Sequence, residues 1–238
     1  MRGPLSVVRF ERAFSSNPRN QTRVQQAAIG VISDLWTYPI KALAPVAHER
    51  VLVESTGLAG DRERALFVET PGHRRYGKTL RGKENALMHT ASDVASGIAL
   101  AERGGAAVRL SEPARYFDAA PVSLIFDTWL RECERRAGVA VQAERFRSNI
   151  VVRCEAGFRL AEADLVGMTI VIGDGTVCLR VVAAIERCVT PAYDLTTGET
   201  DTAILRAIAK DRGNRVGIYA EVVTPGTIAR GNTVRLQM

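Results

Sequence analysis

The stretch Met168–Gly198, MTIVIGDGTVCLRVVAAIERCVTPAYDLTTG, decides how the rest of the chain is interpreted. Two apolar runs, Met168–Ile172 and Val177–Ala184, flank the turn Gly173-Asp174-Gly175, and this pattern predicts a β-hairpin. The second strand leads into a short polar loop that holds Cys188. We therefore expect a mostly β protein in which this hairpin delivers a cysteine to the end of a strand.

Cys188 has Arg187 before it and Thr190-Pro191 after it. A neighbouring cation favours the charged form of a thiol. The thiolate ligates soft or high-valent metals and attacks electrophiles. A lone cysteine is, however, most often a small buried hydrophobic residue without chemistry. The local sequence leaves both interpretations open, so residues elsewhere in the chain must decide.

Short strand patterns separated by turns fill most of the remaining sequence. Two segments have helical periodicity: residues 121–138, with Ser123 as a candidate N-cap and Gly138 at the end, and residues 201–212, followed by Gly213. Residues 86–118 show strand-like pieces without a clear motif. Many short strands and two good helices predict a mostly β, barrel-like fold of the α+β class.

The composition is that of a globular protein, with 46% hydrophobic and 24% charged residues. No apolar run approaches the ~20 residues of a membrane span, so no membrane partner is expected. The four cysteines lack zinc-ligand spacing, and we interpret them as reduced thiols of a cytoplasmic protein. Three histidines without HExxH spacing make a histidine-built metal centre improbable.

A net charge of +6 suggests a nucleic-acid partner at first sight. Five arginines and one glutamate in residues 1–25 account for +4 of it, so the rest of the chain is nearly balanced. A basic nucleic-acid face is therefore not expected. The Arg- and Ser-rich residues 1–26 are predicted to form a disordered tail. They are compatible with a transit peptide or with an upstream start codon, and we favour the second.

Several groups that can bind anions lie at predicted strand ends or in turns. Arginine offers a planar fork of donors for phosphate, and lysine a point charge. The basic loop 71–83 is expected to be mostly a solvated hairpin tip, with one or two side chains facing an anion. A loop cysteine together with such groups, without a phosphate-binding P-loop, fits a phosphorylated cofactor whose metal takes a protein thiolate. The groups are Lys41, Arg62, Arg147, Asn149 and Arg187.

Five stretches, in this order, resemble the MOSC family, the molybdenum-cofactor sulfurase C-terminal-type domains. The resemblance is strongest to the branch with the mitochondrial amidoxime-reducing component and its bacterial relatives. The stretches are LWTYPIKAL at 35–43, GLAGDR at 57–62, RFRSNIVV at 145–152, RCVTPAYDLTTG at 187–198 and GIYAEVVTPGTIARGNTVRL at 217–236.

The resemblance implies an N-terminal β-barrel region over residues 27–120 and a β-barrel MOSC domain over residues 121–238. It also implies a molybdenum–molybdopterin cofactor whose metal is ligated by Cys188, which would then be the catalytic residue. The positions that match those holding the cofactor's phosphate and pterin, or flanking its ligand, are Lys41, Arg62, Arg147, Asn149, Arg187 and Asp194.

Three positions depart from the family pattern. Ala42 replaces a serine that often follows the lysine, Ser148 replaces a proline, and Ile185 stands where some relatives have a second cysteine. None of these changes removes the expected metal ligand. They do weaken the assignment of the phosphate site and leave the substrate open.

The resemblance implies an oxidoreductase that reduces small N-hydroxylated compounds. Electrons would come from separate proteins, a flavin reductase and a small electron carrier, because the chain has no flavin or iron–sulfur motif. Two alternatives stay open: a sulfur carrier with a persulfide on Cys188, and a protein that stores or delivers the cofactor. Metal analysis separates the sulfur carrier from the other two.

Overall fold

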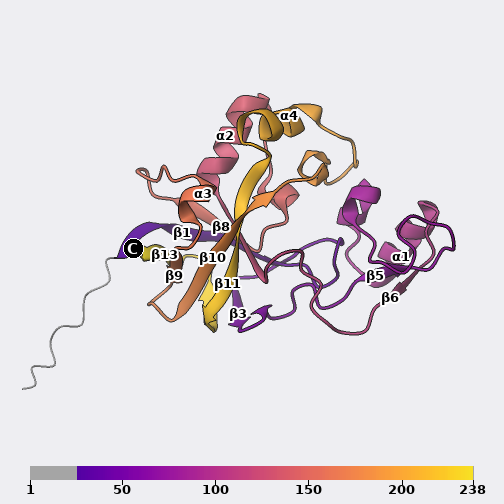
Figure 1. The fold of residues 1–238 in the computed structure, drawn as a ribbon, viewed down its shortest axis with the longest axis horizontal. Coiled ribbons are helices and arrows are strands. Elements are labelled where there is room, and N and C mark those ends of the chain that lie inside the picture. Colours follow the sequence, from indigo (N-terminus) through magenta and orange to yellow (C-terminus); the bar gives the residue numbers. More distant parts are fainter. Residues whose placement is uncertain (1–25, 238) are drawn as a thin grey trace, which may run out of the picture.

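Seven strands close into a barrel in the structure, which is a computed structural model and describes residues 26–237 (Figure 1). Neighbouring strands are antiparallel, except that β7 and β8 are parallel. The predicted tail lies outside the described residues, apart from Gln26, which begins the first strand. In order around the barrel the strands are β1 (Gln26–Thr37), β8 (Ile150–Cys154), β7 (Val122–Phe126), β11 (Arg215–Thr224), β10 (Val177–Glu186), β9 (Thr169–Ile172) and β13 (Thr233–Gln237).

The predicted hairpin is confirmed as β9 and β10, with Val177 opposite Ile172. Side chains of β10 alternate at first between the barrel core, such as Leu179, and the surface, such as Arg180. This alternation is the period of a strand with one buried face. β10 then ends at Glu186, so Arg187 and Cys188 follow directly at its end, as the sequence predicts.

The barrel closes through β1 and β13, with Gln26 opposite Gln237 and Val31 opposite Thr233. β1 also pairs with β8 on its other side, where Leu35 faces Ile150. The sequence analysis placed residues 27–37 in an N-terminal region. The structure instead builds them into the same barrel as the C-terminal half.

The predicted helix over residues 121–138 is wrong in its first third. Residues 122–126 form β7, all of whose side chains are buried, and α2 begins at Asp127 and ends at Ala137. Ser123 is therefore a strand residue and not an N-cap. Gly138 does end the helix, in the left-handed conformation at φ 72°.

Helices cover one side of the barrel. α2 and α4 (Thr202–Asp211) lie next to each other above the strands, and α3 (Glu162–Leu165) packs against β10 and β11 (Figure 1). α4 confirms the predicted second helix, and Asp201 caps it by accepting a hydrogen bond from the Ala203 N–H. No helix of the described residues is long and apolar enough to span a membrane.

A smaller lobe lies beside the barrel and has a hydrophobic core of its own around Leu66, Met88 and Leu100 (Figure 1). The predicted mostly β, barrel-like fold is confirmed, and within the region expected over residues 27–120 the lobe combines short strands with one helix, α1, which was not predicted from the sequence. The elements of the lobe are β5 (Leu66–Val68), β6 (Val108–Leu110), η1 (Gly82–Glu84), η2 (Ala86–Thr90) and α1 (Val94–Arg103).

Short strands and turns connect the lobe with the barrel. A small sheet of β12, β3 and β4 flanks the barrel, and β2 pairs with the last two residues of β1. Two single turns, η3 and η4, precede β8 and follow β10. The bounds are β2 (Val46–Ala47), β3 (Arg50–Glu54), β4 (Gly57–Leu58), β12 (Gly226–Ala229), η3 (Ala143–Phe146) and η4 (Thr190–Ala192).

Candidate functional site

A pocket of about 320 Å³ lies where the lobe meets the barrel. The barrel side contributes the end of η3 with Arg147 after it, the end of β10, the loop that holds Cys188, and Ser123 and Tyr219. The lobe and the turns leading to it contribute residues 41–42, 81–83 and His89. Seven cationic side chains line the pocket: Lys41, Arg62, Arg81, Lys83, Arg145, Arg147 and Arg187.

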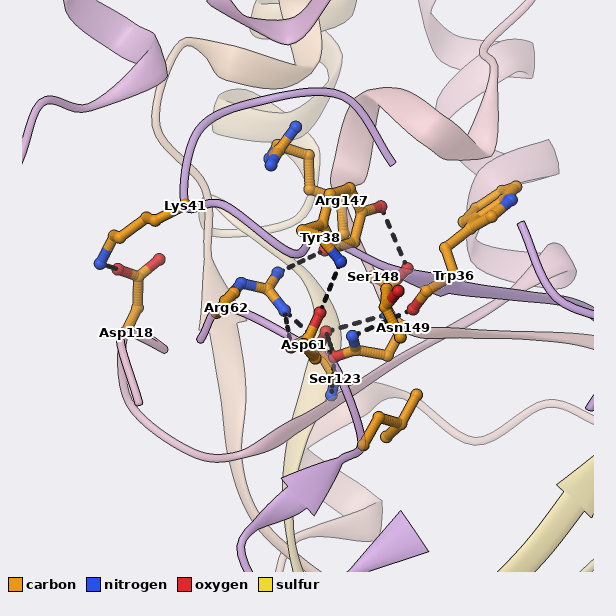
Figure 2. Close-up of polar contacts among 12 residues, drawn as sticks. Trp36, Tyr38, Lys41, Asp61, Arg62, Asp118, Ser123, Arg147, Ser148 and Asn149 are labelled. Atoms are coloured by element: carbon orange, nitrogen blue, oxygen red, sulfur yellow. Dashed lines mark hydrogen bonds and ion pairs between the residues drawn. The ribbon is translucent and has the colours of Figure 1, made fainter. Parts of the chain in front are cut away.

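Tyr38 supports two of these cations. Its buried ring lies under the guanidinium groups of Arg147 and Arg62, whose carbons are 4.2 and 4.7 Å from the ring centroid (Figure 2). Its hydroxyl donates to the Ser148 carbonyl at 3.3 Å. Burial raises the pKa of Tyr38 to about 12, so the phenol stays neutral and the ring acts as an uncharged platform.

Arg62 is fixed from several directions. Its Nη1 contacts Asp61 Oδ2 at 2.5 Å, and its Nη2 donates to the Arg147 carbonyl at 3.0 Å. Asp61 is itself buried and accepts from the Tyr38 N–H at 2.8 Å. Burial lowers the pKa of Arg62, but the charge and hydrogen bond of Asp61, together with the charges of Tyr38 and Asp118, outweigh burial and raise the pKa above its usual value. Arg62 is therefore a permanently charged, carboxylate-paired wall of the pocket.

Arg147 has no carboxylate partner within ion-pair distance among residues 26–237. Its Nη1 lies 3.1 Å from Nδ1 of His89 in η2, across the junction of barrel and lobe. A guanidinium can donate only, so Nδ1 accepts and the ring proton sits on Nε2. Burial, and then the charge of Arg147, lower the pKa of His89 to about 3. Burial also lowers the pKa of Arg147 to about 10, so the guanidinium stays charged at neutral pH beside a neutral imidazole.

Arg187 is turned inward, away from solvent. Its Nε and Nη1 donate at 2.6 Å to the carbonyls of Val216 and Phe146, while its buried Nη2 has no hydrogen-bond partner among the described residues. Gly217 makes room for it: a Cβ at that position, where φ is +94°, would lie 2.7 Å from Nη2. Burial lowers the pKa of Arg187 to about 10. The group is a buried cation with one free donor.

Asp194 does not line the pocket. It organises the loop that follows η4, because its Oδ1 accepts the N–H groups of Thr196 and Thr197 at 2.9 Å. Its Oδ2 holds Nη2 of Arg145 at 2.9 Å. Arg145 does line the pocket, and its Nη1 is buried without a partner among the described residues. Asp194 thus contacts the pocket through Arg145.

Asn149 is fully buried and lies behind the pocket wall (Figure 2). Its Oδ1 accepts from the backbone N–H and the hydroxyl of Ser123 at 3.0 and 2.8 Å, and its Nδ2 donates to the Trp36 carbonyl. Ser123, in contrast, lines the pocket. Asn149 therefore joins β1, β7 and β8 at the base of the site.

The thiol of Cys188 is exposed, and its Sγ lies 3.1 Å from the Thr190 hydroxyl. Cys133 is buried, and Cys154 and Cys178 are half-buried. Burial raises the pKa values of Cys133 and Cys154 to about 11, which keeps those thiols protonated. No group of three or more His, Cys, Asp or Glu side chains placed to hold a metal occurs among residues 26–237. Cys188 is therefore the accessible thiol at the pocket.

The structure brings together Lys41, Arg62, Arg147, Arg187 and Cys188 of the predicted residues, and places Asn149 and Asp194 behind them. Four further residues that line the pocket were not predicted as site residues from the sequence: Arg145, His89, Ser123 and Tyr219. Arg145 belongs to a stretch already singled out, so its position beside Arg147 was a usable signal. His89 lies in a segment without a motif and could not have been found.

The family model described as the MOSC domain matches residues 111–235, which is more than half of the chain. The chain belongs to the MOSC domain family. The match begins ahead of residue 121, where the sequence analysis expected the domain to start. It omits β1, although β1 completes the MOSC barrel. The narrower resemblance to the amidoxime-reducing branch stays a prediction.

Solved structures are similar to this chain, and one of them, at a TM-score above 0.5, shares its fold. The YuaD protein from Bacillus subtilis aligns with 90% of this chain and 97% of its own, at a TM-score of 0.54 and 16% identity. YiiM from Escherichia coli aligns with 89% of this chain and 70% of its own, at a TM-score of 0.43 and 15% identity. YiiM from Geobacillus stearothermophilus aligns with 55% of this chain and 67% of its own, at a TM-score of 0.39 and 20% identity. No curated protein matches the chain.

Proposed function

We propose that this MOSC protein binds the molybdenum cofactor in the pocket between barrel and lobe, with Cys188 as the protein ligand of the metal, and reduces N-hydroxylated compounds. One observation carries the proposal: a cation-lined pocket reaches an exposed thiol, and two of its guanidinium groups, those of Arg147 and Arg187, have no carboxylate partner among residues 26–237. Such a pocket matches a ligand with an anionic end and a thiophilic metal.

The residues present fit such a ligand. Arg145 and Arg187 each keep a buried N–H nitrogen without a partner among the described residues, and an unpaired buried donor is costly unless a ligand satisfies it. Arg147 is held in place by Tyr38 and His89 rather than by a carboxylate, so its charge is free for a phosphate or a pterin oxygen. Lys41 adds a point charge to the pocket wall.

The bound cofactor would supply two-electron redox chemistry, and the protein would position the substrate and limit its access to water. Reduction of a hydroxylamine takes two electrons and two protons, breaks the N–O bond and releases water. The choice of N-hydroxylated substrates rests on the family resemblance. The electrons would come from a separate flavin reductase and a small carrier protein.

Metal and pterin content test the proposal directly. The full chain, produced in cells that synthesise the cofactor, should contain molybdenum and pterin in equal amounts, and Cys188→Ser should lose the metal and the activity with a reduced chemical donor. Cys178→Ser, at a half-buried cysteine away from the pocket, serves as the matched control. Metal-free protein with a persulfide on Cys188 would instead indicate sulfur transfer. Loaded protein that reduces no N-hydroxylated compound would indicate a cofactor carrier.

A further inference from the structure

The pocket contains a carboxylate of its own. Asp118 lines the pocket, and its Oδ1 lies 2.5 Å from Nζ of Lys41 (Figure 2). The side chain of Lys41 is 19% exposed and that of Asp118 is 68% exposed, so the pair lies at the solvent side of the pocket. A carboxylate is an unexpected neighbour for a cation that would hold an anionic ligand.

The backbone places Asp118 there. The Ala114 N–H donates to the Glu63 carbonyl at 3.0 Å and the Tyr116 N–H to the Arg62 carbonyl at 2.8 Å. The Lys41 N–H donates to the carbonyl of Arg64 at 2.8 Å. Three segments far apart in the sequence thus run side by side, and they carry Asp118 and Lys41 to the same place.

Asp118 is charged at neutral pH. Burial would raise its pKa, but Lys41, followed by Arg62 and Arg147, holds the pKa below its usual value. The same cations would attract an anionic ligand. The carboxylate and such a ligand therefore compete for one set of charges.

We propose that Asp118 is a resident counter-anion: it occupies Lys41 in the free protein and must be displaced from it when the phosphate of the ligand enters. This inference rests on the proposed anion site. An ion pair with one solvent-exposed partner is weak enough to exchange. Asp118 therefore lowers the affinity of the pocket for anions, and favours release and exchange of the ligand over its permanent retention.

Asp118→Asn tests the inference because it predicts a gain, which a folding defect cannot imitate. Calorimetry on the full chain prepared without cofactor would use inorganic phosphate and dimethyl phosphate near pH 8. We expect Asp118→Asn to bind inorganic phosphate about two- to fivefold more tightly than the parent. The gain should be smaller for singly charged dimethyl phosphate, because the removed repulsion scales with ligand charge.

Two control variants separate displacement from a general change of net charge. Glu186→Gln removes a second carboxylate of the pocket wall, which lies 3.7 Å from Arg215 rather than beside Lys41, and should give a smaller gain. In a Lys41→Met background, Asp118→Asn should increase the affinity for inorganic phosphate by no more than Glu186→Gln does. Equal or weaker phosphate binding by Asp118→Asn would overturn the inference while leaving the anion site intact. No phosphate binding by the parent would overturn both.

Discussion

The guanidinium of Arg147 lies over the ring of Tyr38 at 4.2 Å, although 108 residues separate the two in the sequence. Tyr38 follows the last residue of β1, and Arg147 follows η3 in a left-handed conformation at φ +53°. An aromatic face thus substitutes for the carboxylate that a buried arginine usually has. The charge of Arg147 is held in place without being neutralised.

We expect Tyr38→Leu to empty the pocket of cofactor and Tyr38→Phe to spare it. Leucine removes the ring from two guanidinium groups, each interaction contributing about 0.5–2 kcal/mol. Phenylalanine keeps the ring and loses a 3.3 Å hydrogen bond, at a cost of about 1 kcal/mol in the free energy of unfolding. Pterin content and urea unfolding of both variants measure the two effects. Equal pterin content would contradict the role of the ring.

Substitution of Gly217 should disturb Arg187. In Gly217→Ala the new methyl group would lie 2.7 Å from Nη2 of Arg187 and 3.0 Å from the Leu124 carbonyl. We expect a loss of several degrees in Tm together with lower pterin content. Gly231→Ala, at φ +82° with nothing within 4 Å of the new carbon, carries the backbone strain alone, about 1–3 kcal/mol. Similar pterin content in the two variants would show that Arg187 is not part of the site.

Two adjacent residues should differ sharply in their contribution to stability. Asn149→Ala removes the hydrogen-bond partner of the buried Ser123 N–H and one partner of the Trp36 carbonyl. We expect it to lower the free energy of unfolding by about 2–4 kcal/mol. Ser148→Ala removes a buried hydroxyl that has no partner among the described residues, and should be neutral or slightly stabilising. Thermal unfolding compares them, with about 2–4 °C per kcal/mol at this size. A stable Asn149→Ala variant would contradict the hydrogen-bond network.

How far the sequence predicts this structure depends on whether a signal is local. The β9–β10 hairpin and α4 are local patterns, and both were predicted. The boundary between β7 and α2 was not, because Ile125 of the buried strand stands at helical spacing from Trp129 and Cys133 of the helix, so strand and helix give one apolar stripe. The pairing of β1 with β13 joins the ends of the described chain, and no local pattern encodes it.

The same distinction holds for the site. The stretches around Cys188 and Arg147 contain three of the seven cations that the pocket brings together, Arg145, Arg147 and Arg187. The prediction that Asn149 contacts the cofactor stays a prediction; the structure shows that its Oδ1 accepts from Ser123, a contact that depends on strand pairing and that no local pattern encodes. The position of His89 in the pocket depends wholly on how the lobe packs against the barrel, and residue patterns in the sequence do not predict that packing.

Stability should fall in acid because of His89. Its pKa is about 3 in the folded protein and about 6.5 when unfolded, so between these values the unfolded chain binds a proton that the folded one excludes. This predicts a loss of about 2 kcal/mol between about pH 7 and pH 5. His89→Gln, which keeps an acceptor for Arg147, should have a shallower slope in urea unfolding at the two pH values. Identical slopes would contradict the buried neutral imidazole.

Thiol labelling should single out Cys188. At about pH 8 the buried Cys133 and the half-buried Cys154, with pKa values of about 11, contain very little thiolate, whereas the sulfur of Cys188 is exposed. Limited iodoacetamide followed by peptide mass spectrometry should find the adduct on Cys188 first. Bound cofactor should slow the reaction, and unchanged kinetics in loaded protein would argue against Cys188 as its ligand.

The pairing of Gln26 with Gln237 has a consequence for how the protein is made. β13 is synthesised after the other strands of the barrel, so β1 must wait, with one edge open, until β13 has left the ribosome. Closure of the ring is then a late and slow event of high contact order. The pocket draws on residues from 41 to 219, so the proposed phosphorylated ligand would meet it only after these residues are synthesised, and chaperones that shield open strand edges would act before that ligand does.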